Sequence, residues 1–156
     1  MEAALAAFHD AYPDVSLSVD ATRHPFSFDP DGETGTGASW ENMLAGTPWA
    51  ESVEGHHTRL DKQGAAAGIK FDYKVGFDFQ PVDSQRLVLW AGAQGLQEPL
   101  VEVMSQNHFT QRKSVNEPAA LLEAVAMVEG LDPDAALAML QAPDQPFREE
   151  VLSSYR

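Results

Sequence analysis

Proline and glycine divide the second half of the chain into short amphipathic segments, and this division constrains the fold more than any other feature. From Pro81 onward, apolar stripes at spacings of three and four residues start near a proline or a capping side chain and stop at a glycine or proline. The pattern predicts helices over 84–93, 99–109, 118–130, 135–140 and 147–152. The chain is therefore expected to be mostly helical.

The first half has a different pattern. An Ala-rich amphipathic helix is predicted over 2–12 and stopped by Pro13, and two further helices are predicted over 39–44 and from Pro48 to about Gly64 or Gly68. Between them, residues 31–37 have the polar, glycine-rich composition of a flexible loop.

Strict alternation of apolar and polar residues over 15–21 predicts a half-buried strand. The segment 69–79 also alternates, but Gly76 and the lack of a nearby hairpin partner leave a strand and an extended connector equally open. Because a single strand is not stable alone, either this connector supplies a second strand or the missing neighbours lie outside the chain.

Composition excludes several classes of function. The chain has no cysteine, which removes thiolate nucleophiles, disulfides and Cys-ligated zinc from it as given. A net charge of -14 argues against a nucleic-acid partner, since the chain repels phosphate. No apolar run approaches the about 18 residues of a membrane span, and Met1 is not followed by a cationic signal sequence. We expect a soluble protein of the cytoplasm or an organelle interior, unless a leader preceded Met1.

Few side chains are candidates for chemistry. His56 and His57 are adjacent on a predicted helix and cannot chelate one ion together, so with Asp61 they are interpreted as helix surface, and no metal site is expected. His24 lies at the end of the predicted strand, next to Pro25, where functional residues often gather. No nucleophile, base and oxyanion-binding group are found together, so physical reasoning alone indicates no reaction.

Taken in order, several motifs resemble the DsbA-like thioredoxin-fold superfamily, in its FrnE-type branch of dithiol-disulfide oxidoreductases. The exit from the predicted strand resembles the family's PFxLxP motif, with Phe28 in place of the usual leucine. The other matching segments are 1–8, 15–19, the helix 85–91 with Gly95 after it, Phe109, Asn116, Leu121-Leu122 and 130–132. The match covers nearly the whole chain, and its middle part is shared with kappa-class glutathione transferases and 2-hydroxychromene-2-carboxylate isomerases.

The resemblance implies an α/β thioredoxin-like fold that is mostly helical, as one partial DsbA-like domain over residues 1–156. It would comprise a helix and strand of the thioredoxin core at 1–30, a helical insertion at 39–142 and a return toward the core at 143–156. The family's CxxC would stand before the first helix, and its cis-proline loop after the last. Neither is matched here, and no family catalytic residue is carried over.

The function implied by the resemblance is a thiol-disulfide oxidoreductase domain that lacks catalytic competence in this chain. One alternative is a non-catalytic binding or scaffold subunit, and a second is a glutathione-dependent isomerase or transferase, the only case in which glutathione is expected. No cofactor is expected otherwise. A protein partner, or the remaining part of its own fold, is expected to cover the unpaired sheet edges. His24, Pro25 and Phe26 are the candidate contacts to a substrate or partner.

Overall fold

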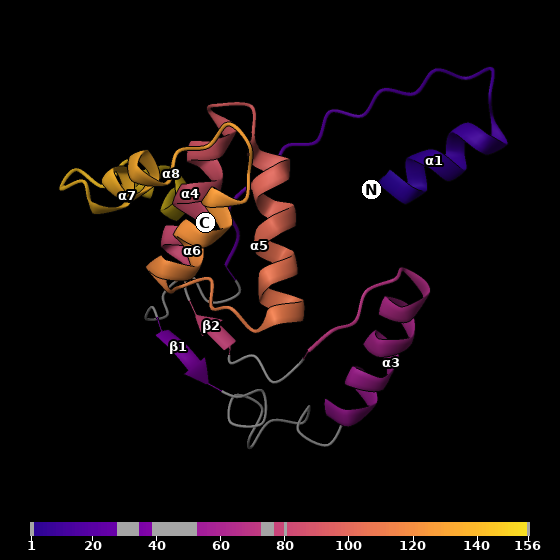
Figure 1. The fold of residues 1–156 in the computed structure, drawn as a ribbon, viewed down its shortest axis with the longest axis horizontal. Helices are drawn as coiled ribbons and strands as arrows, with labels where there is room; N and C mark the ends of the chain where they lie inside the picture. The colour runs from indigo at the N-terminus through magenta and orange to yellow at the C-terminus, as the bar shows by residue number, and fades with distance from the viewer. Residues whose placement is uncertain (1, 28–34, 39–52, 73–76, 80, 156) are drawn as a thin grey trace.

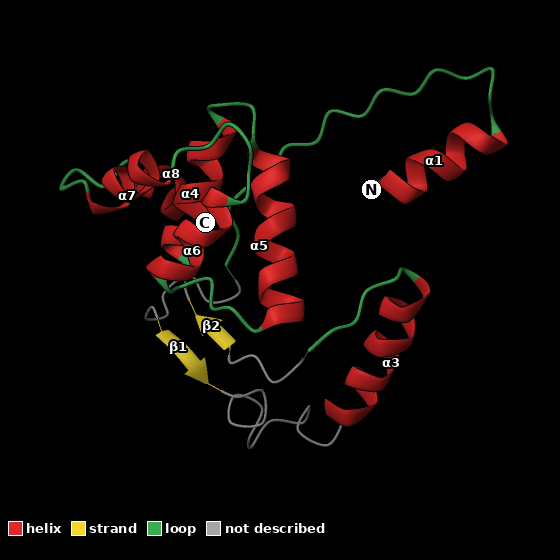
Figure 2. Cartoon of the chain, viewed as in Figure 1, coloured by secondary structure: helices red, strands yellow, loops and turns green. Residues whose placement is uncertain are grey.

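The computed structural model describes residues 2–27, 35–38, 53–72, 77–79 and 81–155. The elements in chain order are α1 (Glu2–Ala11), β1 (Gly35–Ala38), α3 (Val53–Ala66), β2 (Phe77–Phe79), α4 (Val82–Gly92), α5 (Gln97–Gln111), α6 (Pro118–Ala126), α7 (Pro133–Gln141) and α8 (Arg148–Ser154) (Figures 1 and 2). The prediction of a mostly helical chain is confirmed. The helix predicted over 39–44 and the predicted start at Pro48 lie outside the described residues.

Helices α4 to α8 pack into one bundle (Figure 1). Its core consists of buried apolar side chains from each of α4 to α7 and from the turns between them, and Val151 of α8 is also fully buried. The core residues are Leu87, Ala91, Leu100, Met104, Leu121, Ala124, Val125, Val128, Leu131, Ala136 and Met139. These are the positions at which the predicted stripes face inward, so the hydrophobic effect holds the bundle together.

Two helix boundaries in the bundle follow local capping signals, the start of α7 and the end of α4. Asp132 accepts a hydrogen bond from the backbone N–H of Asp134 at 2.9 Å, and Pro133 occupies the first turn of α7. Gly95 follows α4 with a φ of 74°, a left-handed conformation that glycine adopts without steric cost. Local chemistry therefore sets where α7 starts and where the chain leaves α4.

The strand predicted over 15–21 is wrong for this chain. The segment is extended but joins no sheet, and residues 16–22 make no hydrogen bond within the described part of the chain. Its apolar side chains stay exposed, with Val15 at 48%, Leu17 at 40% and Val19 at 47%. An alternating sequence makes a segment suitable for pairing, but a strand forms only where a neighbour supplies the hydrogen bonds.

The described residues do contain a two-stranded sheet, in another place. β1 pairs antiparallel with β2, with Gly35 opposite Phe79 and Ala38 opposite Phe77. The prediction of a loop over 31–37 is therefore wrong for 35–37, while 31–34 lie outside the described residues. The connector is divided: 69–72 form no regular structure, 77–79 form β2, and 73–76 are not described.

The C-terminal end of α3 is joined to α5 by residues 69–72. The backbone N–H of Ile69 donates to Gly64 at 2.8 Å, which closes the helix end. Beyond it, Phe71 packs edge-on against Phe109 of α5, and the N–H of Asp72 donates to the carbonyl of Phe109 at 2.8 Å. Figure 1 shows α3 and α1 standing apart from the bundle, α1 at the far end of the extended segment. Within the described residues, no helix combines the length and apolar character needed to cross a membrane.

Candidate functional site

The segment after residue 22 is fastened to the bundle through Arg23. The Gln97 side chain, in the first turn of α5, accepts a hydrogen bond from the N–H of Arg23 at 2.7 Å and donates to its carbonyl at 3.2 Å. One amide side chain thus satisfies both backbone groups of a single residue, as a neighbouring strand would do. The chain is held at this point even though no strand forms.

An ion pair reinforces the same attachment. The Arg23 guanidinium donates to Glu98 through Nε at 2.6 Å and through a terminal nitrogen at 3.1 Å. The hydrogen bond from Arg23 holds the pKa of Glu98 below its usual range and, in return, the bond to Glu98 raises the pKa of Arg23. The pair is partly exposed, so solvent screens it and its contribution to stability is small.

The second attachment lies three residues later. Gln85 of α4 donates from its side-chain amide to the carbonyl of Phe26 at 2.7 Å. The chain is therefore held at two points, where the Arg23 backbone binds α5 and where the Phe26 carbonyl binds α4. His24 and Pro25 lie between these points, and the Phe26 side chain projects at the second. His24 is exposed, Pro25 is half-buried, and Phe26 is 60% exposed. The three consecutive candidate residues thus lie on one short loop held at both ends, which we call the 23–26 loop.

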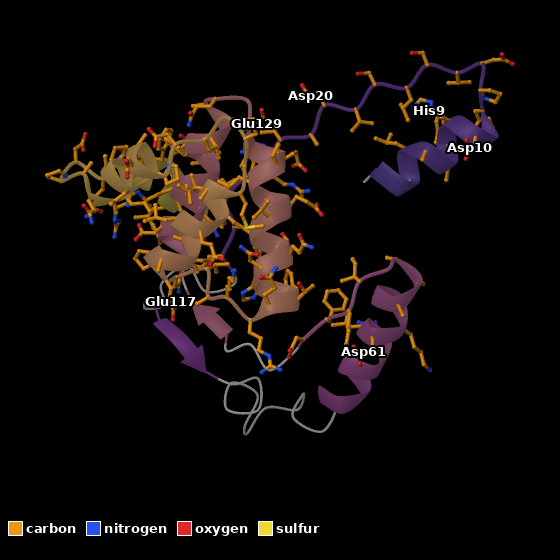
Figure 3. The ribbon with its side chains drawn as sticks, viewed as in Figure 1. His9, Asp10, Asp20, Asp61, Glu117 and Glu129 are labelled. Atoms are coloured by element: carbon orange, nitrogen blue, oxygen red, sulfur yellow. The ribbon has the colours of Figure 1, made fainter. Side chains whose placement is uncertain are left out.

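A hollow of about 540 Å³ adjoins this loop. Its lining includes the apolar residues Leu89 of α4 and Phe147 and the acidic residues Asp20, Glu98 and Glu150. Figure 3 shows Asp20 where the extended segment reaches the bundle. The hollow therefore combines apolar and acidic residues with the end of the extended segment.

A buried arginine supports the turn that contains Phe147. The Arg86 side chain is 3% exposed and donates to the backbone carbonyls of Met139 at 3.1 Å, Leu140 at 3.4 Å and Pro146 at 2.9 Å. It also pairs with Asp83 at 2.7 Å. Through these bonds α4 fixes the end of α7 and the turn before α8, which carries Phe147 into the hollow.

The other candidate residues of the sequence lie on α3. The side chains of His56 and His57 lie outside the described residues, whereas Asp61 is exposed on α3. His108 is half-buried at the edge of the core, with Nδ1 at 3.0 Å from the carbonyl of Lys113. In the part of the chain that the structure describes, no three histidine or acidic side chains are placed to hold a metal ion.

Sequence reasoning missed the residues that build the attachment. Gln85 is a polar residue of a predicted helix, and Gln97 and Glu98 precede the predicted start of the next helix at residue 99. Their partners are 59 to 75 positions away along the chain. Arg86 falls inside a motif of the resemblance, but nothing in the sequence marks it as buried. A charged residue on the apolar side of a predicted helix is the one signal that points to such a role.

Comparisons with known proteins agree with the fold. A family model described as DSBA-like thioredoxin domain matches residues 4–148. The solved structure of a probable DsbA oxidoreductase from Streptomyces coelicolor is similar to the chain, with a TM-score of 0.67 and 23% sequence identity. The similarity covers 82% of this chain and 55% of that one, so the chain spans about half the length of that structure. Among curated proteins, no match was found. The chain belongs to the DSBA-like thioredoxin domain family.

Proposed function

We propose that this chain is a DsbA-like domain that takes part in thiol–disulfide exchange but does not catalyse it alone. Family membership supports the reaction class. The composition supports the proposal that the chain does not catalyse the exchange alone. Disulfide exchange begins with attack by a thiolate, and this chain has no cysteine. The cysteines that react must then belong to another polypeptide segment, whether a partner or the rest of a longer fold.

The 23–26 loop is the part of the chain proposed to contact the polypeptide whose thiols react. An exposed aromatic ring and an exposed imidazole, held between two hydrogen-bonded anchors, present apolar and polar contacts without a large ordering cost on binding. The observation that carries the proposal is this fixed presentation of Phe26 in a member of a thiol–disulfide oxidoreductase family that lacks cysteine.

The reaction class is tested by the reduction of insulin by dithiothreitol, with and without the purified chain. The expected rate is the uncatalysed one, and a rate that rises in proportion to the chain would contradict the proposal. The contact is tested by binding of a reduced, carboxymethylated unfolded protein. Phe26→Ser is expected to weaken this binding, and Met127→Ser, which alters an equally exposed apolar side chain elsewhere, is expected to leave it unchanged.

A role as a non-catalytic binding subunit is the second candidate. It is favoured by the exposed apolar side chains of the extended segment, which are unusual for a surface with no partner. The two candidates differ in one result. A binding subunit is expected to leave the rate of thiol–disulfide exchange by its partner unchanged. An oxidoreductase domain is expected to alter the rate of exchange by the segment that supplies the cysteines.

A further inference from the structure

We propose that Asn107 binds one buried water molecule inside the bundle, in a small cavity between α5, α6 and the turn that joins them. The side chain is the first observation. Asn107 is 3% exposed, and its amide oxygen and amide nitrogen are both buried with no hydrogen-bond partner in the part of the chain that the structure describes. Such an amide is destabilising, because folding removes its contacts with water and supplies no bond in exchange.

The cavity at Asn107 has the size of one water molecule. Its volume is about 10 Å³, at the lower end of the about 10–15 Å³ that a single water needs. Met104 of α5 and Leu121 and Ala124 of α6 belong to its lining, together with Ser114 of the connecting turn. An amide has an acceptor oxygen and N–H donors, so one water molecule can accept from Nδ2 and donate to Oδ1.

The turn between α5 and α6 is held in a way that keeps this cavity open. The carbonyl of Asn107 accepts from the N–H groups of Arg112 and Lys113, the latter at 3.1 Å. Lys113 Nζ donates to Glu123 of α6 at 2.6 Å, and the Lys113 carbonyl lies 3.0 Å from Nδ1 of His108. Because the turn is bonded to both helices, the site relaxes little, and a cavity that does not collapse is left to be filled.

Water fits this site better than other occupants. A side chain from outside the bundle does not reach the amide, because the chain's own residues already enclose Asn107. A metal ion lacks ligands, since no three histidine or acidic side chains of the described residues are placed to hold one. A small apolar molecule would leave both amide atoms unpaired. Water both donates and accepts, and it costs little entropy when it is bound at a polar site.

Water-selective NOE and ROE spectroscopy of the full chain tests the proposal. We expect cross peaks from water to the Ala124 methyl protons and to the Nδ2 protons of Asn107, with opposite signs in the two experiments. Opposite signs mark a water molecule that tumbles with the protein and exclude proton exchange. The Ala124 methyl group is the cleaner reporter, because its protons do not exchange with solvent. The absence of a cross peak at both groups would overturn the proposal, because the cavity would then be dry.

Substitutions of Asn107 separate the amide from the cavity. Asn107→Leu removes the polar atoms and should abolish the Ala124 cross peak, since an apolar cavity stays dry. Asn107→Ser keeps a hydroxyl group and leaves more room, so it should retain a bound water. Ser84→Ala removes another buried polar side chain, on α4, and should leave the cross peak unchanged. A cross peak that persists in Asn107→Leu would overturn the proposal, because groups other than the amide would then hold the water.

A last variant excludes a false signal from the hydroxyl proton of Ser114, which also lines the cavity. Ser114→Ala should keep the Ala124 cross peak. Its loss would overturn the proposal, because the signal would then come from Ser114 and not from a water on Asn107. Helical circular dichroism checks that each variant is folded. None of these measurements involves thiol exchange, so this inference and the proposed function fail separately.

Discussion

The bundle of residues 81–155 and the described segments of residues 2–72 differ in how far their apolar side chains are buried. In the bundle, stripes from α4 to α7 meet in one core, and Leu87 and Leu100 are fully buried. In the first region, the most regular alternation of the chain leaves Leu17 and its apolar neighbours exposed. The difference shows that a helix needs only another apolar face, whereas a strand also needs a neighbour's backbone.

The largest expected effect follows from cutting the chain between the two regions. A fragment of residues 81–156 should keep its helical circular dichroism and unfold cooperatively, because its core is its own. A fragment of residues 1–80 should be largely unstructured, because short helices without packing are marginal in water. A stably folded fragment of residues 1–80 would show that the first region also has a core of its own.

Single core substitutions should reproduce this contrast on a smaller scale. Leu87→Ala removes a fully buried side chain of α4 and should lower the free energy of unfolding by about 2–5 kcal/mol. Leu17→Ala in the extended segment should change it by no more than about 0.5 kcal/mol. Urea denaturation of both variants checks the pair. Similar losses would mean that residues 15–21 are packed in solution.

The buried arginine offers an intermediate effect. Arg86→Met keeps much of the volume but leaves the carbonyls of Met139 and Pro146 without their donor, and it should cost about 1–3 kcal/mol. Asp83→Asn neutralises only the exposed member of the ion pair and keeps an oxygen that can accept from Arg86, so it should cost less than about 1 kcal/mol. Comparing their denaturation midpoints separates the carbonyl bonds from the ion pair. Equal costs would show that the ion pair carries the effect.

The smallest effect concerns the attachment of the 23–26 loop. Because Arg23 lowers the pKa of Glu98, the ionised form favours the attached loop. The contribution, within about 0.2–1 kcal/mol, is present above the ordinary glutamate pKa of about 4.3 and is lost as the pH falls through the lowered value. Amide chemical shifts of Arg23 and Phe26 followed from pH 6 to pH 2 report the release. In the Glu98→Gln variant this pH-dependent change in chemical shift should disappear. If the change persists, another carboxylate causes it.

Much of the helical half was predictable from sequence because its signals are local. Asp132 with Pro133 starts α7 through a bond to a residue two positions away, and Gly95 ends α4 through its own φ. The same reasoning failed for residues 15–21. Alternation of apolar and polar residues indicates that a segment is suitable for strand pairing, but not that a neighbouring strand is present. It failed again at β1, where a glycine-rich stretch with loop composition pairs with a strand about forty residues later.

The candidate site was predictable only in part. His24, Pro25 and Phe26 were chosen because they follow the predicted strand and match a family motif, and their role as contacts stays a prediction. The side chains that hold their loop, Gln85 and Gln97, lie on helices that are distant in the sequence, and a polar residue at a helix surface carries no mark of its partner. The division into core remnant, insertion and return also stays a prediction.

The sequence by itself determined the helices of the second half, the family and the absence of a thiol, because caps, stripes and composition act within a few residues or by simple count. Tertiary structure alone decided that Arg86 is buried, that Gln97 binds the backbone of Arg23, and that the extended segment joins no sheet among the described residues. These features depend on which surfaces meet in space, and a linear pattern does not encode its own partner.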